Sequence, residues 1–200
     1  MSTKRGVIQG NEQLEAILRE GSGLGGVVIC HPHPLYGGSM YNNVVDAIDA
    51  GYSARGYTTL RFNFRGVGGS SGSYGEGEGE TEDLIAAYQY LKGACRPGAH
   101  LVLAGYSFGA WIAARTHHLL SDLSSIFLVA LPIALYGTGR LSSFAGTLYL
   151  VAGSYDDIAP ARDIKEFYER LPGNNRHLKI IAASHFFEAR EREIASYIEE

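Results

Sequence analysis

Hydrophobic residues in this chain gather in short runs, and the segments between the runs have a different spacing. Four runs are apolar at nearly every position, at 27–30, 101–104, 126–133 and 148–152. Strands that are buried on both faces of a parallel sheet show such runs, because neither face meets water. Between the runs apolar residues recur every three or four positions, as in 84–91, which indicates helices.

The pattern predicts strands that alternate with helices. An antiparallel hairpin at the sheet edge opens the chain, with strands around 7–8 and 14–18 joined by a turn at Gly10-Asn11. Six further strands are predicted at 27–30, 57–64, 101–104, 126–133, 148–152 and 178–182. Five helices are predicted at 42–55, 81–91, 110–119, 161–171 and 186–200. This order favours one α/β domain over residues 1–200, with a mostly parallel sheet covered by helices on both faces.

Composition narrows the class of protein. The chain has 200 residues, of which 46% are hydrophobic and 19% charged, and no apolar stretch is long enough to cross a bilayer. A net charge of -4 without a Lys/Arg cluster argues against nucleic-acid or anionic-membrane partners. Residues 1–10 carry two basic residues but no apolar segment comes after them, so we expect no secretory signal. Cys30 and Cys95 form no disulfide framework, and we expect both to be reduced in a cytoplasmic protein.

The polar residues of chemical interest come directly after the predicted strands. They are His31, His33, Ser107, Asp156, Asp157 and His185. In an open α/β sheet the ligand site lies beyond the carboxyl ends of the strands. These side chains are therefore expected to meet at one edge of the sheet.

Ser107 stands at the tip of a predicted strand-turn-helix, in the sequence LVLAGYSFGAWIAAR over 101–115. A serine at such a corner projects its hydroxyl above the sheet, and flanking glycines allow the strand and helix to pack closely. The pentapeptide G-x-S-x-G alone is weak, because Gly68-Gly69-Ser70-Ser71-Gly72 matches it in a Gly/Ser-rich loop without a helix after it. Context selects Ser107, with an ordinary helix-capping serine as the alternative.

A serine hydroxyl is a poor nucleophile at neutral pH, so it needs a base and a carboxylate that orients the base. His185 comes after the last predicted strand and suits the base, and Asp156 or Asp157 suits the carboxylate. The chain order Ser, Asp, His is the order described for α/β-hydrolases. His100, His117, His118 and His177 lie at helix ends or before strands, and we interpret them as surface or structural residues.

Five segments resemble the α/β-hydrolase superfamily: HPHPLYGGSM, RFNFRGVGGSSG, GYSFGA, GSYDDIAP and SHFF. More narrowly, the chain is similar over nearly its whole length to small, lidless predicted hydrolases akin to dienelactone hydrolase. The resemblance implies an α/β-hydrolase fold with the nucleophile at Ser107 and the base at His185. It favours Asp156 as the acid, three residues after Gly153 as in the family's G-x-x-D pattern, and leaves Asp157 as a turn residue.

His31 and His33 allow two interpretations. Two histidines two residues apart could share a metal ion, but no third ligand stands at a suggestive spacing, so we predict no metal and no other cofactor. The alternative is an oxyanion hole, which needs two backbone N–H groups. In related hydrolases one donor is the residue after the nucleophile, here Phe108, and the other comes from the loop after the strand that ends at Cys30. Proline has no N–H, so His33 is the nearest donor, with Tyr36 or Leu35 as alternatives.

Candidate substrate contacts are Tyr36, Tyr106 and Tyr136, and Tyr155 could line the pocket as well. The default interpretation of each tyrosine is packing, since the chain has 13. Polar residues of the segment 61–65, namely Arg61, Asn63 and Arg65, are expected to support neighbouring loops.

The expected activity is cofactor-free cleavage of small carboxylic esters or thioesters through an acyl-enzyme, with a small acyl substrate as the partner. A peptidase or carbon–carbon hydrolase on the same fold, or a non-catalytic binding protein, are the alternatives. Only residues 134–147 separate two predicted strands where larger esterases insert a helical lid, so we expect an open site that prefers short acyl groups. The sequence gives no indication of the oligomeric state.

Overall fold

Eight strands form one sheet in the order β1-β2-β4-β3-β5-β6-β7-β8 in the computed structural model, which describes residues 2–199. The first strand pairs antiparallel with the second and the second with the fourth, and the other neighbours are parallel. The strands are β1 Thr3–Gln9, β2 Gln13–Arg19, β3 Gly25–Cys30, β4 Thr58–Phe62, β5 His100–Tyr106, β6 Leu123–Val129, β7 Thr147–Gly153 and β8 Arg176–Ile181.

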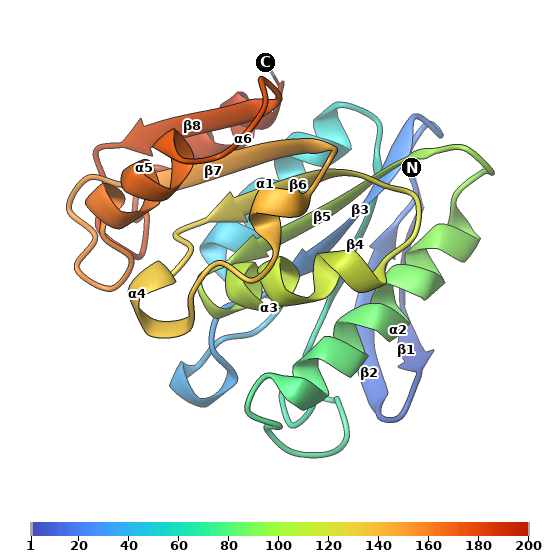
Figure 1. Ribbon diagram of the computed structural model, residues 1–200. Helices are drawn as coiled ribbons and strands as arrows, with labels where there is room; N and C mark the ends of the chain where they lie inside the picture. Colours follow the sequence, from blue (N-terminus) through green and yellow to red (C-terminus); the bar gives the residue numbers. More distant parts are fainter. Residues whose placement is uncertain (1, 200) are drawn as a thin grey trace.

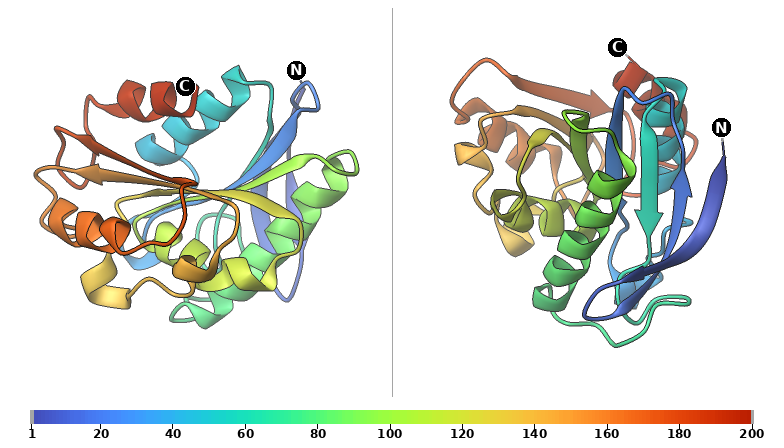
Figure 2. Two further views of the ribbon diagram at one scale, coloured as in Figure 1. Left: turned by 45° about the horizontal axis from the view of Figure 1, so that its top comes forward. Right: turned by 90° about the vertical axis from the view of Figure 1, so that its right-hand side faces the viewer.

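The helices cover both faces of the sheet (Figure 1). They are α1 Asn43–Ala54, α2 Glu78–Ala94, α3 Phe108–Thr116, α4 Ile133–Tyr136, α5 Ala161–Glu169 and α6 Glu191–Glu199, with 3₁₀ turns at Pro34–Tyr36, His117–Leu119 and Leu141–Ser143. Figure 2 shows α1 and α6 together on one face, and α2, α3, α4 and α5 on the other. This three-layer arrangement confirms the predicted α/β fold.

The core lies on both sides of the central strands, as the apolar runs require. Val27, Val28 and Ile29 of β3 and Leu103 of β5 are fully buried. Burial of such side chains supplies about 25 cal/mol for each Å² removed from water, which favours central strands with no polar face. The sheet therefore holds its carboxyl edge rigidly, and the loops at that edge carry the polar residues predicted to meet there.

Several predicted boundaries were wrong, and three of them change the loops at the carboxyl edge of the sheet. Helix α2 begins at Glu78 instead of Thr81, because Glu80 accepts the N–H groups of Gly75 and Gly77 and draws the acidic run into the first turn. Strand β6 ends at Val129 instead of 133, since Ala130 has a φ of 50° and turns the chain out of the sheet.

The closing helix also starts later than predicted, at Glu191 instead of Phe186. Phe187 and Ala189 have positive φ angles of 52° and 60°, which an α-helix cannot contain. The predicted last residue of that helix, Glu200, lies outside the described residues. The segment 186–190 is consequently a loop at the same edge as the candidate site.

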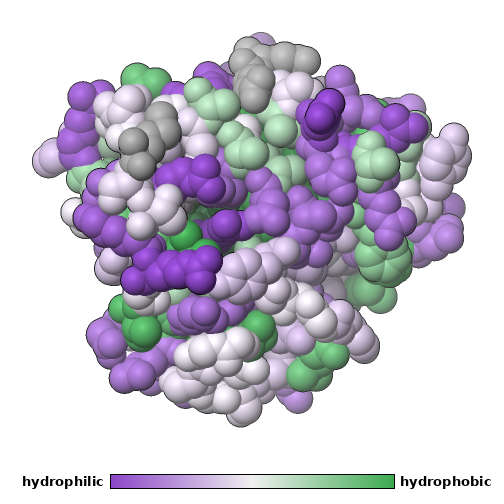
Figure 3. Space-filling view, turned by 180° about the vertical axis from the view of Figure 1, so that it is seen from behind, coloured by the Kyte–Doolittle hydropathy of each residue, from purple (hydrophilic) through white to green (hydrophobic). Residues whose placement is uncertain are grey.

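Hydrophilic residues dominate the surface on the side of α1 and α6, where the hydrophobic ones form separate small patches (Figure 3). Among residues 2–199, no helix combines the length and the apolar character that a bilayer crossing requires. Cys30 and Cys95 are free thiols. The compartment in which the protein works stays a prediction.

Candidate active site

Ser107 lies at a sharp corner between β5 and α3. Its φ of 54° and ψ of -117° are rarely adopted by a residue with a side chain, and such strain is typical of functional sites. A Cβ atom on Gly105 would collide with the backbone of Gly109, and one on Gly109 would collide with the backbone of Cys30. Only glycine at both positions permits this close packing, so the local sequence itself dictates the corner.

His185 faces Ser107 from the loop after β8. Its Nε2 lies 2.9 Å from the Ser107 hydroxyl oxygen, and its Nδ1 lies 2.8 Å from Oδ2 of Asp156. Ser107 is 8% exposed, His185 7% and Asp156 5%, so water has little access to these hydrogen bonds. With the proton on Nδ1, the imidazole donates to the carboxylate and accepts the serine proton.

The two neighbouring aspartates differ sharply in surroundings. Oδ1 of Asp156 accepts the backbone N–H groups of Ile158 and Ala159, at 2.9 and 2.7 Å, while its Oδ2 faces His185. These bonds fix the carboxylate in one orientation. Asp157 is exposed and contacts neither Ser107 nor His185. The geometry thus favours Asp156 over Asp157 as the carboxylate partner of His185, as the resemblance did.

Tyr106 holds the histidine loop in place. Its ring is 2% exposed, and its hydroxyl donates a 2.7 Å hydrogen bond to the carbonyl oxygen of His185. Burial raises the pKa of this hydroxyl, so it stays protonated and able to donate. The residue predicted as a substrate contact therefore also positions the imidazole.

Two backbone N–H groups near Ser107 remain free among the described residues. Neither His33 nor Phe108 uses its N–H in a hydrogen bond, whereas the N–H groups of Leu35 and Tyr36 bond to His33. Both free groups belong to residues that line the cavity around Ser107. An oxyanion that forms beside Ser107 can accept hydrogen bonds from groups of this kind.

Comparison with known proteins places this geometry in a family. A model described as the alpha/beta hydrolase family matches residues 27–197. The chain belongs to the alpha/beta hydrolase family. Its match to an uncharacterized protein of Rickettsia prowazekii (strain Madrid E) is 34% identical over 179 residues, covering 86% of this chain and 75% of the relative.

Solved structures agree with the family assignment. An alpha-beta serine hydrolase homologue from Coxiella burnetii superposes with a TM-score of 0.89 at 34% identity, covering 99% of this chain and 96% of that one. A serine hydrolase without a lid from Xanthomonas campestris gives 0.87 at 27% identity, covering 98% and 92%. This family member thus has the lidless α/β-hydrolase fold that the sequence predicted.

A cavity of about 480 Å³ opens onto Ser107 and His185 in this alpha/beta hydrolase. Tyr36, Tyr106 and Tyr136 all line it, while Tyr155 is 70% exposed and lies elsewhere. Three further apolar residues that sequence reasoning missed also line the cavity, and they are Leu135, Ile158 and Phe186. Each stands in a segment that follows a strand's carboxyl end, Leu135 in the short helix α4, and that position is the only signal that could have identified them.

A connected set of rings, here called the aromatic wall, lies along one side of the cavity. Four of its rings line the cavity directly, and the rings of Tyr74 and Trp111 contact those four: the lining rings are His33, Tyr36, Phe108 and Tyr136. His33 contacts the rings of Tyr36, Tyr74 and Phe108, with centroids 4.7 to 5.1 Å apart. Phe108 packs against Trp111, whose ring stacks on Tyr136 at 4.3 Å. The wall gives the lidless site an apolar surface for the uncharged part of a substrate.

His31 has a structural position instead of a ligand position. It is fully buried, its Nδ1 donates to the Pro32 carbonyl at 2.6 Å, and its Nε2 accepts the Phe64 N–H at 3.0 Å. Burial lowers the pKa of His31 to about 4, so the ring is neutral. Since both ring nitrogens of His31 already form hydrogen bonds, neither is available to bind a metal ion together with His33. Residues 2–199 contain no cluster of three metal-ligating side chains.

The polar residues of 61–65 support loops, as expected. Asn63 accepts the Met40 N–H through Oδ1 and donates to Glu15 through Nδ2. Arg65 forms a salt bridge with the buried carboxylate of Asp83, at 2.8 Å. Arg61 pairs with Asp46. These contacts tie the loops after β3 and β4 to their surroundings and leave the cavity to the aromatic residues.

Proposed function

We propose that this protein is a serine hydrolase that cleaves small carboxylic esters or thioesters through an acyl-enzyme. The supporting observation is the unbroken series of hydrogen bonds from Ser107 through His185 to Asp156, buried beside a cavity that opens to solvent. Ser107 is the nucleophile, His185 the base, and Asp156 the carboxylate that fixes the tautomer of the base.

In the first step, Ser107 Oγ attacks the acyl carbon while His185 Nε2 takes the hydroxyl proton. The negative charge that develops on the acyl oxygen is stabilised by the N–H groups of His33 and Phe108. The C–O or C–S bond then breaks as the imidazolium returns the proton to the leaving alcohol or thiol. Water, deprotonated by the same imidazole, attacks the acyl-serine and releases the carboxylic acid.

The loop between β6 and β7 favours small substrates. Residues 130–146 contain only the single turn α4 and one 3₁₀ turn, so no helical lid encloses a long acyl chain. A closed tunnel would stabilise each additional buried methylene by about 0.8 kcal/mol, and an open cleft cannot do so beyond the aromatic wall. We therefore propose acetyl to butyryl esters as the preferred substrates.

A series of p-nitrophenyl esters from acetate to palmitate tests the acyl preference. We expect kcat/KM to be highest between two and four carbons and to fall with longer chains. Ser107→Ala protein is the blank for background hydrolysis. A maximum at long chains would contradict the open-cleft argument, and hydrolysis of amide or carbon–carbon substrates alone would replace the ester proposal.

A further inference from the structure

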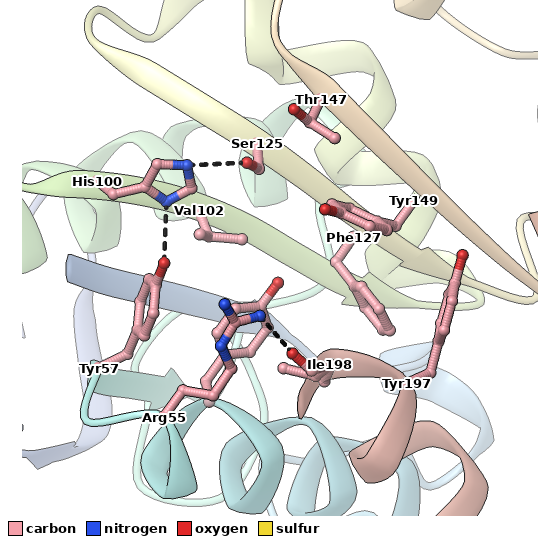
Figure 4. A pocket seen from close by; sticks show the side chains of 11 residues that line it. Arg55, Tyr57, His100, Val102, Ser125, Phe127, Thr147, Tyr149, Tyr197 and Ile198 are labelled. Atoms are coloured by element: carbon pink, nitrogen blue, oxygen red, sulfur yellow. Dashed lines mark hydrogen bonds between the residues drawn. The ribbon is translucent and has the colours of Figure 1, made fainter. Parts of the chain in front are cut away.

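A second cavity lies at the opposite edge of the sheet from Ser107. Figure 4 shows side chains that line it. It has a volume of about 180 Å³ and is enclosed by the last turns of α1 and α6 and by the amino-terminal halves of β5, β6 and β7. Strand β5 runs from His100 in this cavity to Tyr106 in the first, and the six steps between them, at about 3.3 Å each, separate the two by about 20 Å. The cavity is thus independent of the proposed chemistry.

Tyr52 supplies a hydroxyl that has no partner among the described residues. The side chain lines the cavity and is 6% exposed, and its hydroxyl forms no hydrogen bond with any residue of 2–199. The Tyr52 hydroxyl is not among the fully buried polar atoms that lack a partner, so water in the cavity can reach it. A tyrosine hydroxyl can donate one hydrogen bond, and a ligand in the cavity can replace that water as the acceptor.

No carboxylate side chain is among the described residues that line the cavity. Arg55 is the one lining residue of that range with a permanent charge, and its guanidinium donates to the Ile198 carbonyl at 2.5 Å, as Figure 4 shows. An arginine has five N–H donors, so others remain for a ligand. Burial raises the pKa of Tyr52, against a smaller lowering by the Arg55 charge, so the hydroxyl stays protonated and can donate a hydrogen bond. The charge of Arg55 therefore favours a negatively charged ligand.

The imidazole of His100 also lines the cavity, and its protonation state decides whether it adds a second positive charge. Its Nδ1 lies 3.2 Å from the Tyr57 hydroxyl and its Nε2 lies 3.1 Å from the Ser125 hydroxyl (Figure 4). Burial first and Arg55 second lower the pKa of His100, which keeps the ring neutral at neutral pH. His100 therefore orients two hydroxyls and leaves Arg55 as the cation.

The floor of the cavity is apolar. Val102 and Phe127 of the central strands are 1% exposed, and the ring of Phe127 meets those of Tyr52 and Tyr149 with centroids 6.1 Å apart. A water molecule occupies about 30 Å³, so 180 Å³ exceeds the room that one or two waters need and suits a small ring or short chain. An apolar floor with donors at the rim matches a ligand that has a carbon body and one anionic end.

We propose that this cavity binds a small organic carboxylate of about the size of benzoate, with the carboxylate on Arg55 and Tyr52 and the carbon body against Phe127. The carboxylate accepts hydrogen bonds from the guanidinium and from the tyrosine hydroxyl. A neutral molecule of the same shape lacks the charge that would pair with Arg55. Inorganic phosphate lacks the carbon body that would pack against the apolar floor. Both should therefore bind more weakly than the carboxylate.

Titration of the full-length protein with benzoate, followed by amide NMR shifts and calorimetry, tests the proposal. We expect saturable binding with the largest shifts at Arg55, His100 and Val102. Benzamide and inorganic phosphate are the matched probes, and each should bind at least tenfold more weakly. Shifts confined to the neighbourhood of Ser107, equal binding of benzamide, or tighter binding of phosphate would each overturn it.

Two variants separate a binding role from a structural one. Tyr52→Phe and Arg55→Gln should each weaken benzoate binding about tenfold or more, since each removes a hydrogen bond to a charged group. Tyr52→Phe should leave the denaturation midpoint unchanged or raised, because its hydroxyl has no partner within residues 2–199. Tyr90→Phe on the outer side of α2 is the control and should bind as the parent does. Unchanged binding in both cavity variants would overturn the proposal.

Discussion

Two segments of this molecule share the pattern G-x-S-x-G, and their serines have opposite surroundings. The Ser70 hydroxyl donates to the Asn63 carbonyl at 2.8 Å and accepts the Glu15 N–H at 2.9 Å. The first bond lies within the loop after β4, and the second joins that loop to β2. The Ser107 hydroxyl instead lies 2.9 Å from an imidazole, at a strained residue that opens a helix. The pattern G-x-S-x-G therefore does not determine whether its serine has structural hydrogen bonds or faces an imidazole. The segment that follows each serine makes the difference.

The glycines around the two serines meet different physical demands. At Ser107 they allow a strand to pack against a helix, because a side chain on either would collide with backbone. In the 68–72 loop they serve left-handed turns, since Gly68 and Gly72 have φ angles of 57° and 76°. Both turns come after parallel strands, and of the two only the turn at Ser107 joins a strand directly to a helix.

The two aspartates near Ser107 should show the greatest contrast in activity. Asp156→Asn should lower kcat by about 10⁴-fold, because an amide stabilises the wrong tautomer of His185. Asp157→Asn is the matched control, and its exposed side chain predicts a change of less than about threefold. Steady-state kinetics on p-nitrophenyl acetate measure both variants. A larger loss of kcat in the Asp157 variant would instead assign Asp157 as the carboxylate partner of His185.

A pH effect on stability comes from His31, which anchors the backbone at Phe64 just before the Ser70 loop. Burial lowers the pKa of His31 from 6.5 to about 4, so the unfolded chain binds its proton first as the pH falls. The stability is therefore complete above about pH 6.5 and declines toward pH 4, by about 3 kcal/mol. Urea unfolding at several pH values measures it.

The matched variants for this pH effect are His31→Gln and His118→Gln. His31→Gln should flatten the dependence of unfolding free energy on pH by about 3 kcal/mol. His118 is exposed, so His118→Gln should leave the dependence of the unfolding free energy on pH unchanged. Identical pH profiles in the parent and in His31→Gln would show that His31 is not held neutral by the fold.

Substitution of Ser70 should have a smaller effect, confined to stability. Ser70→Ala removes one hydrogen bond within the loop and one between the loop and β2, so the free energy of unfolding should fall by about 1–2 kcal/mol. kcat/KM should stay within about twofold, because the bonds of Ser70 run to Asn63 and Glu15 and not to His185. Ser73→Ala, at an exposed position, is the control for stability. A large loss of activity in correctly folded Ser70→Ala protein would argue against a purely structural serine.

The sequence predicted the sheet and the three polar residues that the structure brings together, for one physical reason. Fully apolar runs mark central strands, and the residues after parallel strands must meet at one edge. The late start of α6 was missed because positive φ angles at Phe187 and Ala189 leave no mark on apolar spacing. The loop that they form places Phe186 in the site cavity.

Other features escaped prediction because they depend on three-dimensional neighbours. The aromatic wall joins residues from the loops after β3, β4 and β6 to residues of α3, and each ring alone resembles ordinary packing. The Tyr52 hydroxyl is distinctive only because no described residue reaches it. A single sequence offers no signal for an unmet hydrogen bond, whereas the folded chain displays it directly.

The assignment of Ser107 as the nucleophile is tested by covalent labelling with a fluorophosphonate and peptide mapping. The reagent modifies a serine only where a base activates it, so we expect one modified peptide, containing Ser107, in the parent and in Ser70→Ala protein. Ser107→Ala protein should show no modified peptide and no ester hydrolysis above background. A modified Ser70 peptide beside an unmodified Ser107 peptide would contradict the assignment.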